Sequence, residues 1–157
     1  MNEVDGGAGA GWVAHLRDLV RELADGESLM VRAPASGVRP VRLRRARLGG
    51  LIPAKHESVA AWVRLVRYED HLKGFCVGAE ALGGSFPLSP EEDAALLALG
   101  WRRPDRREGT DYVRFWPDDV AQGPFLPREE AERAARMVLA SFTDVLAPGS
   151  DPPTVTR

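Results

Sequence analysis

Hydrophobic residues recur at helical spacing near the start of the chain and then alternate with polar residues along most of its first half. Between positions 12 and 23 the apolar residues lie three or four positions apart, and Gly26 follows; they are Trp12, Leu16, Leu19, Val20 and Leu23. This spacing predicts an amphipathic helix. Apolar and polar residues then alternate between Pro or Gly breaks, which predicts four strands over residues 28–33, 38–48, 59–68 and 74–82. Because no helix interrupts these strands, we expect neighbouring strands to be antiparallel.

The run LSPEEDAALLALGW marks both ends of a second helix. Ser89 is a favourable N-cap, Pro90 suits the first helical position, and Glu92 lies three residues after Ser89, which is the spacing of a capping box. At the other end, Gly100 readily adopts the left-handed conformation that closes a helix. We therefore expect Trp101 to fold back onto the last turn of this helix.

Two further elements complete the predicted fold. The run YVRFW predicts a fifth strand over residues 111–116, with Tyr112, Arg114 and Trp116 on one face and Val113 and Phe115 on the other. Apolar residues recur at helical spacing over residues 128–146, which predicts the last and longest helix. The order α-β-β-β-β-α-β-α indicates an α+β fold, in which helices pack on one twisted antiparallel sheet of about five strands.

Composition indicates one domain between two short tails. The chain has 157 residues, of which 44% are hydrophobic, so it is long enough to bury one core. Residues 1–11 end with GGAGAG and residues 148–157 begin with PGSDPP, compositions with few apolar groups to offset the entropy lost on ordering. We expect two disordered tails, 1–10 and 148–157, and a single α+β domain over 11–147.

Charge and cysteine content place few constraints on partners. The net charge is only −2, so no global field commits the protein to nucleic acid or to an anionic membrane. The single cysteine excludes an internal disulfide, and no apolar leader or membrane span is evident in the sequence, so we expect a cytoplasmic, reduced setting. The basic residues are 19 Arg and 2 Lys, a bias typical of high-GC bacterial genomes.

The residues that most often carry catalysis or metal binding lack the required spacing. His15, His56 and His71 do not pair at i, i+4, and Cys76 has no CxxC partner. We interpret the three histidines as surface residues and Cys76 as a small buried hydrophobe. The acids that open the second helix favour its dipole, which accounts for them without acid–base catalysis. We therefore expect no enzyme activity, no metal and no cofactor.

Several of these segments together resemble a known family. The features are the run GAEALGG, then LSPEE, the LxxLGW ending at Trp101 with Pro104 following, the YVRF strand, and the closing helix that ends near TDVL. They resemble actinobacterial members of the YbjN and type III secretion chaperone-like group, also called TY-Chap domains. The resemblance is best over residues 74–146. It implies a helix-backed antiparallel sheet, a peptide-binding chaperone or adaptor role without catalysis, and frequent homodimers.

The aromatic residues suggest where a protein or peptide client would bind. There are more of them than one face of a small sheet needs, although the alternative that most lie in the core stays open. If Tyr112 and Trp116 project away from the helices, they form an apolar patch of the kind that marks interaction surfaces. The candidate partner-binding surface comprises Trp62, Tyr68, Trp101, Tyr112, Arg114 and Trp116.

An Arg-rich segment offers an alternative function. The stretch from Arg39 to Arg47 contains no acid, and its basic candidates are Arg42, Arg44, Arg45 and Arg47. If Arg42 and Arg44 share a strand face near Trp62 and Tyr68, the combination is one that single-stranded nucleic-acid-binding modules use. The near-neutral net charge and the lack of RNA-binding motifs argue against this function. A solvated strand protected by its charges against aggregation explains the same residues.

Overall fold

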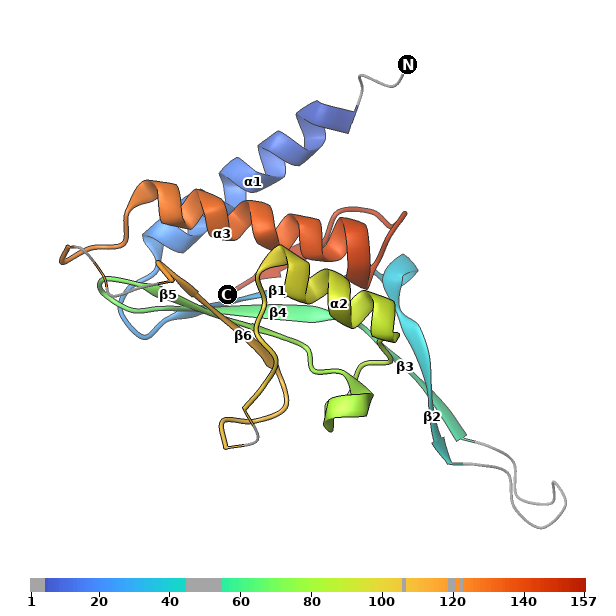
Figure 1. The fold of residues 1–157 in the computed structure, drawn as a ribbon. Helices are drawn as coiled ribbons and strands as arrows, with labels where there is room; N and C mark the ends of the chain where they lie inside the picture. The colour runs from blue at the N-terminus through green and yellow to red at the C-terminus, as the bar shows by residue number, and fades with distance from the viewer. Residues whose placement is uncertain (1–4, 45–54, 106, 119–120, 122) are drawn as a thin grey trace, which may run out of the picture.

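A five-stranded antiparallel sheet is the centre of the computed structural model, which describes residues 5–44, 55–105, 107–118, 121 and 123–157 (Figure 1). The strand order is β6-β5-β4-β1-β7. Their bounds are β1 Ser28–Arg32, β4 Trp62–Arg67, β5 Leu72–Cys76, β6 Tyr112–Trp116 and β7 Thr154–Thr156. Every neighbouring pair is antiparallel. The predicted α+β fold is confirmed.

The three α-helices lie on one side of this sheet (Figure 1). They are α1 Asp5–Glu22, α2 Pro90–Leu99 and α3 Arg128–Ala140, and α3 continues into a π-helical segment, η4 Ser141–Leu146. Along the strands, residues that face the helices alternate with residues that face the other way. Among those that face the helices, Val31, Val63, Leu65 and Leu72 are fully buried. The hydrophobic core therefore lies between the helices and one face of the sheet, as the amphipathic patterns predict.

The second helix has the two ends that the sequence predicts. The Ser89 hydroxyl accepts a hydrogen bond from the Glu92 N–H at 3.2 Å, and the Glu92 carboxylate accepts one from the Ser89 N–H at 2.9 Å. Gly100 has a φ of +109°, and the Trp101 N–H donates to the Leu96 carbonyl at 3.1 Å. This Schellman ending turns the chain sharply and directs Trp101 into the core.

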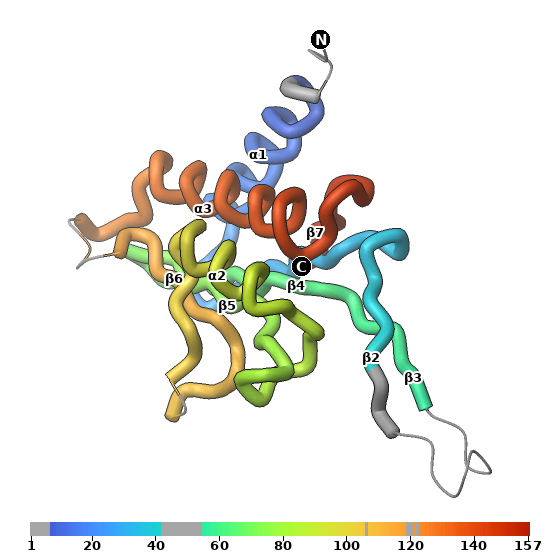
Figure 2. Tube along the Cα trace, turned by 45° about the vertical axis from the view of Figure 1, so that its right-hand side comes forward, coloured from blue at the N-terminus to red at the C-terminus, as the bar shows by residue number. Residues whose placement is uncertain are grey.

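Strands β2 (Arg39–Arg44) and β3 (Lys55–Val59) form a separate two-stranded ribbon, joined to β1 through the short helix η1 (Ala35–Gly37). This ribbon projects away from the main body (Figure 2). The second predicted strand, 38–48, therefore belongs to this ribbon and not to the five-stranded sheet. The ribbon is inserted between β1 and β4, which pair directly with each other. Residues 45–48 of the predicted second strand lie outside the described residues.

Arg39 connects the base of this ribbon to α2 and η4 through an ion pair and hydrogen bonds. Its guanidinium forms a bidentate ion pair with Glu92 of α2 and also donates to the carbonyl oxygens of Val145 and Leu146, at 2.9 and 3.1 Å. The same group lies 4.9 Å from the ring centroid of Phe86. The first Arg of the basic segment thus has a structural role.

The ends of the chain differ from the predicted tails. Helix α1 already begins at Asp5, and β7 pairs with β1 at the edge of the sheet. The indole N–H of Trp12 donates to the carbonyl of the buried Pro153 at 2.9 Å, which holds the segment before β7 against α1. Long-range contacts therefore offset the ordering cost that composition alone suggested.

Two predicted strands also have different bounds. Strand β5 begins at Leu72 and ends at Cys76, and residues 80–82 of the predicted strand form a short 3₁₀ helix, η3 (Glu80–Leu82). Residues 59–61 of the predicted third strand divide between the end of β3 and a break before β4. The β3 residues Lys55 and His56 pair with Arg44 and Arg42, so His56 lies in a strand and not in a loop.

Candidate functional site

None of the three α-helices covers the opposite face of the sheet (Figure 1). Large apolar side chains lie on that face. Because Leu29, Val63 and Leu65 face the helices, their neighbours along the strands face the other way. We call this side the open face. Its central members are Met30, Arg32, Trp62, Arg64, Lys73, Phe75, Val113 and Phe115. The aromatic and aliphatic residues among them are half-buried, which leaves part of each exposed to solvent.

Aromatic and cationic side chains form a connected row across the open face. The Lys73 Nζ lies 4.9 Å from the ring centroid of Phe75 and 5.2 Å from that of Phe115. On the far side of Phe75, the Arg64 guanidinium carbon lies 5.8 Å from the ring centroid. Beyond Phe115, the ring of His71 lies 6.2 Å away, centroid to centroid. These interactions orient side chains from β4, β5 and β6 into one continuous surface.

Tyr68 completes this row at the turn between β4 and β5. The Tyr68 ring stacks on that of His71, with 4.6 Å between the ring centroids and an interplanar angle of 12°. Tyr68 is 37% exposed. The Tyr68 N–H donates to the His71 carbonyl at 2.9 Å, so the turn holds both rings on the same side. The aromatic–cationic row therefore comprises Tyr68, His71, Phe115, Lys73, Phe75 and Arg64.

The charge on the open face is positive. Among the strand positions of the main sheet that face away from the helices, Arg32, Arg64 and Lys73 are cationic and none is acidic. Within the part of the chain that the structure describes, these three cations form no ion pair. At the turn between β4 and β5, the Asp70 carboxylate contacts His71 Nδ1 at 2.6 Å. That interaction lowers the pKa of Asp70 below its ordinary value.

Three residues of the predicted partner surface are core residues, which corrects the prediction. Trp101, Tyr112 and Trp116 are 2%, 0% and 1% exposed. The two indole rings meet edge to face at 6.0 Å. The alternation along β6 is as predicted, but α2 and α3 pack on the face that carries Tyr112 and Trp116. These rings therefore pack beneath the helices and cannot contact a partner.

On this helix-facing side of β6, Tyr112 and Arg114 make polar contacts with α2 and the residues that follow the helix. The Tyr112 hydroxyl donates to Asp93 of α2 at 2.6 Å. The pKa of Tyr112 is raised, mainly because the hydroxyl is buried and also because it lies beside the Asp93 carboxylate. Arg114 donates to the carbonyl of Gly100 at 3.0 Å and pairs with Asp118. Arg114 thus binds the C-terminal end of α2, where a cation is favourable. Both side chains position the helix layer.

Only Trp62 and Tyr68 of the predicted partner surface lie on the open side. Trp62 is half-buried and pairs in register with the exposed Arg32. The residues that sequence reasoning missed are Phe75, Lys73, Val113 and Phe115. A signal for them is present in β5, where Gly74 and Cys76 alternate with Lys73 and Phe75. The small residues Gly74 and Cys76 lie on the helix side, where Gly74 leaves room for the rings of Trp101 and Trp116. The larger residues Lys73 and Phe75 lie on the open face.

The alternative basic surface is not assembled as predicted. Arg42 and Arg44 lie in β2, which pairs with β3 and not with the strand that carries Trp62. A register shift between Arg42 and Arg44 also interrupts the regular alternation of that strand. Arg45 and Arg47 lie outside the described residues. The arrangement of Arg side chains beside Trp62 and Tyr68, on which the nucleic-acid prediction rests, is therefore unsupported.

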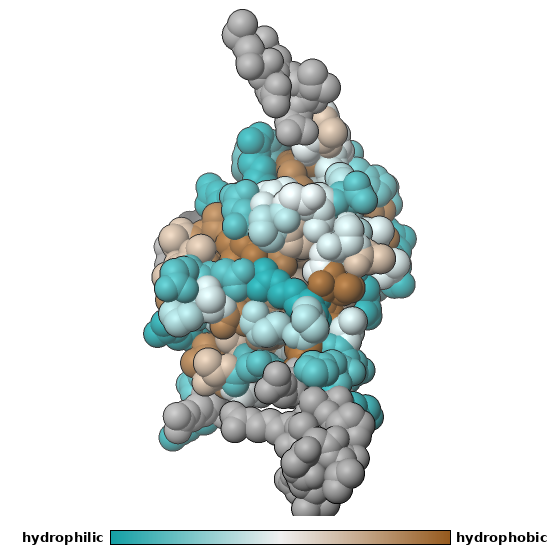
Figure 3. Space-filling model, turned by 90° about the vertical axis from the view of Figure 1, so that its right-hand side faces the viewer, coloured by the Kyte–Doolittle hydropathy of each residue, from teal (hydrophilic) through white to brown (hydrophobic). Residues whose placement is uncertain are grey.

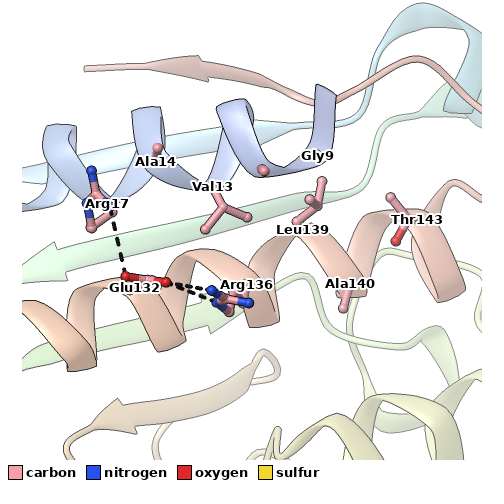
Figure 4. A pocket seen from close by; sticks show the side chains of 10 residues that line it. Gly9, Val13, Ala14, Arg17, Glu132, Arg136, Leu139, Ala140 and Thr143 are labelled. Carbon is pink, nitrogen blue, oxygen red and sulfur yellow. Dashed lines mark hydrogen bonds and ion pairs between the residues drawn. The ribbon is translucent and has the colours of Figure 1, made fainter. Parts of the chain in front are cut away.

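A concave surface lies between α1 and α3 on the helix side, with a volume of about 530 Å³ (Figure 4). Small and aliphatic residues line it, including Gly9, Ala10, Val13, Ala14, Leu139 and Ala140. Its charged residues already have partners, since Arg17 pairs with Asp18 and Arg136 pairs with Glu132. This α1–α3 groove is therefore hollow enough to hold a ligand, but few of its polar groups are free to bind one.

The side of the molecule seen in Figure 3 shows hydrophobic residues in separate patches between hydrophilic ones. This pattern is common on protein surfaces and by itself marks no binding site. The open face differs from it because aromatic and cationic side chains of three strands are in contact with one another.

The residues considered for catalysis or metal binding are dispersed. Cys76 is fully buried, and burial raises the pKa of its thiol well above the ordinary value. A buried thiol of this kind is unreactive. His15 and His56 are exposed, and His71 contacts Asp70. In the described ranges, no three His, Cys, Asp or Glu side chains are grouped so that they could hold a metal ion.

The described helices were also compared with the length and hydropathy of a membrane span. None of them is long and apolar enough to cross a membrane.

Comparison with known proteins identifies a family. A search of the curated proteins found no match, and neither did a search of the solved structures. The model of the family described as "T3SS (YopN, CesT) and YbjN peptide-binding chaperone 3" matches residues 8–150, a range that includes most of α1, all of α2 and α3, and every described strand except β7. The predicted resemblance is thereby confirmed: the chain belongs to the TY-Chap3 family of peptide-binding chaperones.

Proposed function

We propose that this protein is a non-catalytic chaperone or adaptor that binds a segment of a client polypeptide on the open face. The observation that carries the proposal is the aromatic–cationic row, in which Phe75 and Phe115 stay partly exposed on the side of the sheet opposite the helices. Contiguous exposed apolar surface in a soluble domain is typical of interaction sites. Membership of a peptide-binding family makes a polypeptide the expected ligand.

The chemistry of the open face supports this choice over the α1–α3 groove. Aromatic side chains contribute most of the energy of many protein interfaces, because each buries a large area with few rotatable bonds. The open face presents four such rings besides His71: Trp62, Tyr68, Phe75 and Phe115. The groove is lined by small residues, among them Gly9 and Ala14, and it presents no aromatic side chain.

The edges of the sheet favour binding across the face. At the β6 edge, the N–H and carbonyl of Val113 are already paired with Arg102, at 3.0 Å each. At the other edge, β7 is only three residues long. An added client strand would find few free backbone groups beside β6, whereas side-chain contacts on the open face need none.

A random 12-residue phage library tests this function. Peptides are selected on the intact protein and their affinities are then measured by fluorescence anisotropy. We expect Phe115→Ser to weaken binding at least tenfold, because it removes a ring from the row, while Leu139→Ser in the groove leaves binding unchanged. Thermal melting of each variant shows whether it is folded. Equal affinity of wild type and Phe115→Ser, or loss of binding in Leu139→Ser alone, would overturn the proposal.

Three finer points stay predictions from the sequence and the resemblance. They are a homodimer, a cytoplasmic and bacterial setting, and the organisation of the chain as a single domain, whose ordered ends extend beyond the predicted bounds 11–147. The proposed site requires none of them, since all members of the row lie in one chain. Sedimentation of the intact protein determines its oligomeric state.

A further inference from the structure

The charge of the open face identifies the kind of client that fits it. We propose that the bound segment is acidic as well as apolar, with carboxylates placed beside its hydrophobic residues so that they meet Arg64 and Lys73. This inference rests on the proposed function and adds the chemistry of the ligand.

The first argument is the free-energy cost of removing the Lys73 ammonium from water when a client segment covers it. A segment that packs on Phe75 and Phe115 must also cover Lys73, whose Nζ lies between the two rings. A charge removed from water without a partner is strongly unfavourable. A client carboxylate within reach of Lys73 supplies that partner, whereas a neutral or basic client leaves the ammonium buried and unpaired.

The second argument is that the described strand positions of the open face include no acidic residue. Arg32, Arg64 and Lys73 occupy three neighbouring strands, and the other open-face strand positions are apolar or carry hydroxyl groups. Asp70, at the turn, is engaged with His71, and Glu69 next to it is exposed at the same turn. Asp111, which precedes β6, accepts a hydrogen bond from the Gly78 N–H at 3.1 Å. These acids lie beyond the ends of the strands, and the charged strand positions of the open face are all cationic.

The third argument is that the aromatic rings hold the cations in place. Lys73 interacts with two ring faces and Arg64 lies above one of them, so both charges are directed along the row. Cation–π contacts restrict long side chains at a modest free-energy gain. An ordered cation loses less entropy when it meets a carboxylate than a freely moving surface lysine does. The open face thus favours alternating acidic and apolar side chains.

The same phage library distinguishes this inference from the proposed function. We compare peptides selected by the wild-type protein, by the double variant Arg64→Gln/Lys73→Gln, and by Arg133→Gln. Arg133 is an exposed residue of α3, so its variant removes charge far from the row. We expect wild type and Arg133→Gln to enrich peptides with at least two acids next to apolar residues. We expect the double variant to lose that acidic bias and to bind the original peptides at least tenfold more weakly.

Each outcome has a distinct meaning. Selection of apolar peptides without acidic bias, or of basic ones, by the wild type would overturn the inference and leave peptide binding intact. Retention of acidic selection by the double variant would also overturn it. If no peptide is enriched by any of the folded proteins, both the inference and the proposed function are wrong. Replacing the acids of a selected peptide with Gln should weaken its binding to wild type about tenfold and leave its binding to the double variant unchanged.

Discussion

The guanidinium of Arg39 and the carboxylate of Glu92 form a bidentate ion pair, with N–O distances of 2.7 and 2.9 Å. This pair joins the base of the β2–β3 ribbon to the first turn of α2. Hydrogen bonds to charged groups contribute about 1.5–3 kcal/mol each, and only part of this is lost when the remaining partner can be hydrated. We expect Arg39→Ala to lower the free energy of unfolding by about 2–3 kcal/mol in urea titrations, while Arg133→Ala changes it by less than about 0.5 kcal/mol.

The same pair makes stability depend on pH. The hydrogen bond from Arg39 lowers the pKa of Glu92 below its ordinary value of 4.5. The unfolded chain therefore binds more protons here, so this contribution is fully present above pH 4.5 and is lost as the pH falls through the folded-state pKa. Urea titrations in this acidic range should show a shallower pH dependence in Arg39→Ala than in wild type. Parallel curves for the two proteins would show that the pair does not cause the dependence.

Two glycines should respond in opposite ways to replacement by alanine. A Cβ at Gly74 would lie 2.7 Å from Trp116 Cζ3 and 3.2 Å from Trp101 Cη2. Such overpacking costs about 1–3 kcal/mol. At Gly11 in α1 a Cβ meets nothing within 4 Å, and alanine is the better helix former by about 1 kcal/mol. Chemical denaturation should therefore show Gly74→Ala to be less stable than wild type and Gly11→Ala to be more stable.

Local patterns allowed the elements to be predicted well. The capping box of Ser89 and Glu92 and the left-handed Gly100 are set by residues close in sequence, and the structure has both. The alternation along β6 also placed Tyr112 and Trp116 on one face and Phe115 on the other. These features need no knowledge of distant contacts, because their periodicity and end signals are local.

The choice of sheet face could not be read from β6 alone. Both of its faces carry aromatic residues, and which face the helices cover depends on how β6 pairs with β5. Opposite Arg114, Gly74 leaves space for the Trp116 and Trp101 rings, which places the helix layer on that side. The pairing of β7 with β1 is likewise a contact between distant parts of the chain, and the three β-branched residues of β7 are shorter than the runs that predict a strand.

Photo-cross-linking tests the location of the client directly. A library-selected peptide is mixed with protein in which p-benzoylphenylalanine replaces either Phe115 on the open face or Leu139 in the α1–α3 groove, and the cross-linked product is identified by mass spectrometry. The account predicts an efficient cross-link from position 115, competed by unlabelled peptide, and none from position 139. A cross-link from position 139 with none from position 115 would contradict it.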